Sequence, residues 1–71
     1  MKMNNSLRQF LCFQLSNASE NPTQAELFME CAIGAIHYEI FLGHNIPDGI
    51  EKSWKNKFMK IISERDNNNE S

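Results

Sequence analysis

The sequence has few of the residues that cross-link small proteins. Its two cysteines, Cys12 and Cys31, stand singly within apolar stretches, and the chain has no Cys-x-x-Cys or His-x-x-x-His pair. Disulfide frameworks and structural zinc sites are usually built from such close pairs. We therefore expect two reduced, buried thiols, and we expect no metal at His37 or His44.

Long apolar runs are also missing. No run approaches the ~18 residues that a membrane-spanning helix needs. The apolar stretch 7–15 is interrupted by Arg8, Gln9 and Gln14, so it lacks the continuous apolar region of a secretory leader. We expect a cytoplasmic protein that does not enter a membrane.

Catalytic motifs are equally scarce. The sequence contains no glycine-rich phosphate loop, and only Glu30 and His37, two helical turns apart, resemble an acid–base pair. No nucleophile or second carboxylate is placed to join them, and a chain of 71 residues does not easily enclose a substrate cleft. We expect no enzyme and no cofactor. His37 can instead form a pH-sensitive contact at the edge of a dimer.

Positive charge is absent from the middle of the chain. Every charged residue from Glu20 to Glu51 is acidic, and the next stretch carries four lysines and no acid: Lys52, Lys55, Lys57 and Lys60. This asymmetry favours pairing between segments or between chains. The net charge of −2 disfavours nucleic acid as the main ligand, and the lysines spread around the predicted helix instead of gathering on one face.

The sequence does contain three helical segments, which predict an all-α, three-helix chain. The expected helices span 6–16, 23–42 and 48–65 in one domain that covers 1–65, and the polar tail 66–71 is expected to be disordered. Ser6-Leu7-Arg8-Gln9 and Thr23-Gln24-Ala25-Glu26 have the form of capping boxes, which open helices. Gly43 is suited to close the second helix and Asp48 to cap the third.

The predicted helix 23–42 is apolar around nearly its whole circumference. Only a narrow strip with Glu26, Glu30 and His37 is polar. Two short helices cover roughly two sides of a third, so we expect a remaining apolar face that pairs with the same helix of a second copy. Gly34 fits this expectation, because a mid-helix glycine costs ~1 kcal/mol relative to alanine and is easiest to understand where two backbones approach closely.

The expected dimer interface consists of six residues: Phe28, Ala32, Ala35, Ile36, Glu39 and Ile40. Glu39 stands among apolar positions, so it needs either a cation, from Arg8 or a third-helix lysine of either chain, or an exposed edge of the interface. The third helix has an ordinary apolar stripe that one neighbouring surface can cover: Ile50, Trp54, Phe58, Ile61 and Ile62.

One segment carries a family resemblance. Ile33-Gly34 opens an apolar helix that ends in the turn Gly43-His44-Asn45-Ile46, and one more amphipathic helix follows. This pattern resembles the small enteric biofilm-development regulators, the YmgB/AriR-like two-component-system connector proteins, and the stretch 7–15 is similar to their first helix. The resemblance implies a helical homodimer that modulates a phosphorelay or gene expression in biofilm and acid-stress responses.

The leading hypothesis is therefore a homodimeric, non-enzymatic regulatory adaptor that binds another protein. Two alternatives stay open. One is a DNA-binding regulator whose four lysines, Lys52, Lys55, Lys57 and Lys60, contact phosphates. The other is an inhibitor of a host enzyme, of phage or plasmid type.

Overall fold

The computed structural model describes residues 5–69, and these contain helices and turns but no β-strand. The elements are α1 (Asn5–Glu20), the short 3₁₀ helix η1 (Pro22–Gln24), α2 (Ala25–Phe41) and α3 (Ile50–Asn69). The predicted all-α, three-helix class is confirmed.

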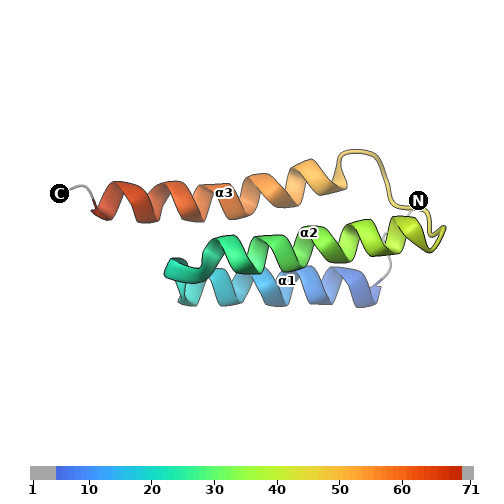
Figure 1. Cartoon of the computed structure of the whole chain (residues 1–71), viewed down its shortest axis with the longest axis horizontal. Coiled ribbons are helices and arrows are strands. Elements are labelled where there is room, and N and C mark those ends of the chain that lie inside the picture. Colours follow the sequence, from blue (N-terminus) through green and yellow to red (C-terminus); the bar gives the residue numbers. More distant parts are fainter. Residues whose placement is uncertain (1–4, 70–71) are drawn as a thin grey trace.

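The three helices lie side by side along one axis. α1 and α2 form an antiparallel hairpin, and α3 runs back antiparallel to α2 (Figure 1). Each helix contacts both of the others. The molecule is consequently elongated, with extents of 45 × 18 × 17 Å, and the C-terminal end of α3 projects past the α1–α2 connection (Figure 1).

The core lies between the three helices and draws on each of them. In α1 the buried positions recur at alternating steps of four and three residues, which keeps them on one helical face. α3 buries Trp54, Phe58 and Ile62, with Ile50 and Ile61 half-buried, so its predicted apolar stripe is confirmed. The buried apolar residues are Leu7, Leu11, Ala18, Ala25, Ala32, Ile36, Trp54, Phe58 and Ile62.

The connection between α1 and α2 is tighter than predicted. The first helix was expected to end at residue 16, but α1 continues to Glu20, because Ala18 is fully buried there and anchors the last turn. The chain then enters η1 through Asn21, whose N–H bonds to the Asn17 carbonyl at 2.9 Å.

The capping box predicted at Thr23 and Glu26 does not form. The Thr23 hydroxyl donates to Asn21 Oδ1 at 2.9 Å, and α2 begins two residues later, at Ala25. The Glu26 carboxylate binds Arg65 of α3 and does not turn back to the helix start.

The end of α2 follows the predicted chemistry. Gly43 has φ 85°, and its N–H bonds to the Ile40 carbonyl at 2.9 Å. The His44 N–H bonds to the Glu39 carbonyl at 3.1 Å, which completes a Schellman motif.

The last helix is longer at its C-terminal end than predicted. α3 starts at Ile50, after Gly49 in the left-handed region, and continues to Asn69. Residues 66–69 of the expected disordered tail are thus helical, while residues 70–71 lie outside the described part. A helix that projects from the bundle needs no apolar residues, so the polar composition led to a wrong prediction of disorder for residues 66–69.

Candidate protein-interaction surface

α2 carries two apolar seams with the same spacing. The inner seam contains every α2 residue that is fully buried and runs, at alternating steps of four and three, through Ala25, Met29, Ala32, Ile36 and Glu39. This spacing keeps side chains on one side of a helix. The inner seam faces α1 and α3, and its apolar side chains are part of the chain's own core.

The second seam begins two residues later and faces solvent. We name it the outer stripe, and it consists of Leu27, Cys31, Gly34, Tyr38 and Phe41. Two residues correspond to about 200° of helical rotation, so the outer stripe lies nearly opposite the inner seam. Leu27 is 55% exposed, Tyr38 60% and Phe41 85%. Burying these side chains would release roughly 25 cal/mol per Å² of apolar surface.

Gly34 stands in the middle of the outer stripe. A Cβ built on it meets no atom of the described residues within 4 Å, apart from its own helix and chain neighbours. The predicted close approach of another backbone therefore does not occur within the chain. No contact among residues 5–69 explains a residue that weakens the helix by ~1 kcal/mol relative to alanine.

The six residues of the expected interface are not all available to a second copy. Ala32 and Ile36 are completely buried between the chain's own helices, so that part of the prediction is wrong. Phe28 and Ala35 are half-buried against the core, whereas Ile40 is 51% exposed. The physical reason is that the two seams are both mostly apolar and equally spaced, so the spacing alone does not determine which one packs against α1 and α3.

Glu39 is satisfied by a partner other than those expected. Its Oε1 lies 2.7 Å from His44 Nδ1, and its side chain is 20% exposed. The expected cations, Arg8 and the α3 lysines, are not its partner in this contact. The pair instead ties the end of α2 to the turn that follows it.

The two flanks of the outer stripe differ in chemistry. One flank holds Glu30 and His37 and borders a shallow hollow that Lys55 also lines. His37 Nε2 lies 2.7 Å from Glu51 Oε1, so this flank follows the α2–α3 groove. The other flank carries three apolar side chains: Phe28, Ala35 and Leu42.

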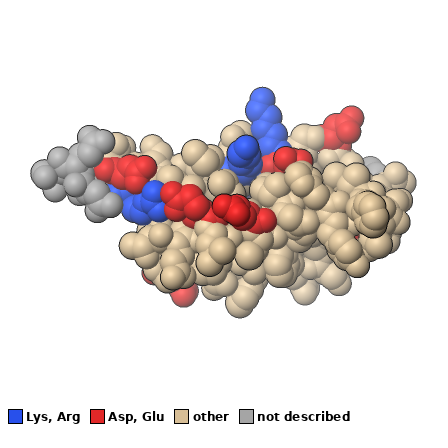
Figure 2. Space-filling model, in the orientation of Figure 1, with Lys and Arg blue, Asp and Glu red and all other residues tan. Residues whose placement is uncertain are grey.

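The four lysines predicted to contact nucleic acid or a partner are all exposed on α3: Lys52, Lys55, Lys57 and Lys60. Lys57 Nζ lies 4.2 Å from the centre of the Trp54 ring, a cation–π contact within α3. On the face drawn in Figure 2, the basic side chains lie among acidic ones and form no large basic patch. On this face, the arrangement does not concentrate the positive potential that phosphate binding requires.

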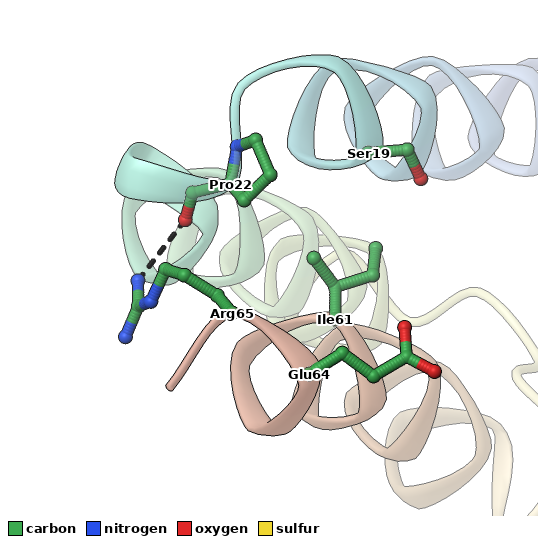
Figure 3. Close-up of a pocket in the computed structure, with 5 residues that line it drawn as sticks. All are labelled: Ser19, Pro22, Ile61, Glu64 and Arg65. Atoms are coloured by element: carbon green, nitrogen blue, oxygen red, sulfur yellow. Dashed lines mark hydrogen bonds between the residues drawn. The ribbon is translucent and has the colours of Figure 1, made fainter. Parts of the chain in front are cut away.

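A second polar site joins the start of α2 to the end of α3. Arg65 donates two hydrogen bonds of 2.7 Å to the Glu26 carboxylate. It donates a third, of 3.0 Å, to the Pro22 carbonyl (Figure 3). The guanidinium lowers the pKa of Glu26 to about 2, chiefly through these side-chain hydrogen bonds. The same contacts, with Asp66, raise the pKa of Arg65.

Arg65 also lines a small hollow beneath η1. Its other lining residues are Ser19, Pro22, Ile61 and Glu64 (Figure 3). The guanidinium joins α3 to the Pro22 carbonyl of η1 and to the Glu26 carboxylate of α2, and we call these contacts the Arg65 clasp.

The cysteines differ from the prediction. Cys12 and Cys31 are free, but both are exposed and not buried. Cys31 belongs to the outer stripe. Within residues 5–69, no group of three or more His, Cys, Asp or Glu side chains is arranged to hold a metal ion.

Within the same part of the chain, none of the helices combines the length and hydrophobicity needed to cross a membrane. Comparisons with protein-family models, with curated proteins and with solved structures found no match to this chain.

Proposed function

We propose that this chain is a small, non-enzymatic regulatory adaptor that acts through protein–protein contacts and self-associates through the outer stripe of α2. The observation that carries this proposal is the exposure of Leu27, Tyr38 and Phe41 in one line along a helix whose opposite side is already buried. Exposed apolar residues that form a continuous surface mark protein-binding sites, whereas isolated ones are ordinary.

The small size of the domain gives a second reason for association. A chain of this length buries only about 60% of the surface that its unfolded form exposes, and its stability needs reinforcement. Disulfides do not supply it, since both cysteines are free. Association through the outer stripe would supply it by removing large apolar side chains from water.

The process in which the adaptor works is proposed from the resemblance of residues 33–46 to biofilm-development regulators. On that basis we propose a role in bacterial signalling or gene expression under biofilm and stress conditions. A cytoplasmic location agrees with two free thiols, because exposed cysteines persist in reducing compartments.

Self-association is tested by the mass in solution. Light scattering near neutral pH is expected to give twice the chain mass of 8.2 kDa. Tyr38→Asp, which places a charge in the outer stripe, is expected to give the mass of one folded chain. Met59→Asp is the matched control, because Met59 is 43% exposed on α3, outside the stripe, and its replacement is expected to leave the dimer intact.

A wild-type mass of one chain at every accessible concentration contradicts the proposal. So does a Met59→Asp variant that loses association as fully as Tyr38→Asp, because association would then not depend on the outer stripe.

A further inference from the structure

The outer stripe has an internal order that restricts how a second copy can lie on it. Its small residues, Cys31 and Gly34, occupy the centre, and its large residues, Leu27 and Tyr38, lie one step further out on either side. A stripe with small side chains at its centre and large ones toward both ends fits a reversed copy of itself. In such a pair, the small residue Cys31 of each copy faces the small residue Gly34 of the other.

We infer that α2 pairs antiparallel with α2 of a second copy, across a two-fold axis, in the register that sets Cys31 against Gly34 of the other copy. This inference rests on the proposed self-association and specifies its geometry. Leu27 then lies level with Tyr38 of the other copy, and Phe41 lies level with Gln24 at its η1 end. Alternating steps of four and three residues are the spacing at which two helices interlock side chains along a seam.

In this register the glycine has a role. Each Gly34 faces a Cys31, so the two backbones approach closely at the centre of the seam, as small residues allow. The open space around the missing Cβ within one chain is filled by the cysteine of the other copy. The helix weakening that glycine causes is thereby compensated in the dimer.

The flanks provide an independent argument for the antiparallel direction. In an antiparallel two-fold pair each flank of the seam faces the same flank of the other copy, whereas in a parallel pair the two different flanks face each other. The antiparallel register brings Glu30 within one turn of His37 of the other copy, twice by symmetry. On the other side it brings Phe28 near Ala35, so apolar groups meet apolar groups.

A parallel pair makes poorer contacts. It places the polar flank, with Glu30 and His37, against the apolar flank, with Ala35 and Leu42. Cys31 would meet Cys31 and Gly34 would meet Gly34, which leaves an empty layer next to a layer of two tyrosines at Tyr38. The matching of polar flank with polar flank, and the fit of side-chain volumes, therefore both select the antiparallel arrangement.

The register is tested with paired cysteine variants. Two proteins are prepared, both with Cys12→Ser and Cys31→Ser; one also carries Leu27→Cys and the other Tyr38→Cys. A disulfide forms only when the two Cα atoms come within about 7 Å of each other. After mild oxidation, an equal mixture is expected to give about tenfold more disulfide-linked dimer than either protein alone.

A mixture of Leu27→Cys with Met59→Cys in the same background is the control, and it is expected to remain unlinked. Preferential linkage of either stripe variant to itself overturns the antiparallel register in favour of a parallel pair. A mixture that stays unlinked, although light scattering shows dimers, also overturns the register but leaves self-association standing. Monomers in light scattering would instead contradict the proposed function.

Discussion

Two single residues, Gly34 and Arg65, have effects on folding and association that can be measured separately. Gly34 lies in the middle of a 17-residue helix, on its exposed side, with open space around it. A glycine there lowers helix stability, and the described part of the chain makes no contact that compensates for it. We therefore expect a contact with another molecule to offset this loss of helix stability.

Substitution of Gly34 separates folding from association. Gly34→Ala is expected to increase the free energy of unfolding of the dilute monomer by about 1 kcal/mol, since alanine is the better helix former and meets no neighbour. Gly34→Leu is expected to weaken dimerisation by at least about tenfold, because its side chain enters a tightly packed seam. Urea denaturation followed by circular dichroism measures the first effect and sedimentation equilibrium the second. Unchanged dimerisation in Gly34→Leu would exclude Gly34 from the interface.

The Arg65 clasp makes the free energy of unfolding depend on pH in the acid range. The folded-state pKa of Glu26 is about 2, below its ordinary value of 4.5, so the clasp contributes fully above pH 4.5. That contribution is lost as the pH falls from 4.5 toward 2. Both side chains are partly exposed, so screening by solvent keeps the effect modest.

Thermal unfolding between pH 5 and pH 2 is the corresponding measurement. The wild type is expected to lose more stability over this range than Glu26→Gln, which has no carboxylate to protonate. Glu20→Gln, an exposed site at the end of α1, is the control and is expected to follow the wild type. Parallel curves for the wild type and Glu26→Gln would show that the clasp does not contribute.

The helices could largely be predicted from the sequence, and their packing could not. The apolar circumference of α2 and the stripe of α3 are visible as helical spacing, and Gly43 closes α2 as expected. Which side of α2 faces inward is not encoded in that spacing, because both seams have it. The partner of Glu26, Arg65, is brought near only by folding, so the capping rule assigned Glu26 wrongly. The contact of Glu39 with His44, five residues further along the chain, was not among the expected ones.

Alanine substitutions of two isoleucines in α2 test which of its two seams faces the core. Ile36→Ala is expected to cost about 2–5 kcal/mol in the free energy of unfolding, because Ile36 is fully buried and its truncation leaves a cavity. Ile40→Ala is expected to cost much less, because Ile40 is 51% exposed. Urea denaturation of the two variants compares them directly. Equal losses would mean that the inner seam has been assigned incorrectly.

The whole molecule is a narrow bundle that exposes large apolar side chains on each helix, among them Phe13 on α1 and Met59 on α3. The outer stripe is distinguished from these by its length and regular spacing. The sequence indicated that some face of α2 would remain uncovered, but it could not show that this face contains Tyr38 and Phe41, because the position of α1 and α3 decides it.

Coupling between folding and association follows from this arrangement. The melting temperature of the wild type is expected to rise with protein concentration, because a dimer formed only by folded chains stabilises them by mass action. Tyr38→Asp is expected to melt at the same temperature at all concentrations. Scanning calorimetry over a hundredfold dilution range, a span of about 2.7 kcal/mol in binding free energy at 25 °C, measures the dependence.

The most direct measurement uses the two native thiols. Cys12 and Cys31 are both exposed in the single chain, but only Cys31 lies in the outer stripe. The rate at which each thiol reacts with an alkylating reagent, followed by mass spectrometry of the digested protein, is therefore compared at low and high protein concentration. Cys31 is expected to become protected as the concentration rises, while Cys12 keeps its rate. Equal and unchanging reactivity of the two thiols over the whole range would contradict burial of the outer stripe by a second copy.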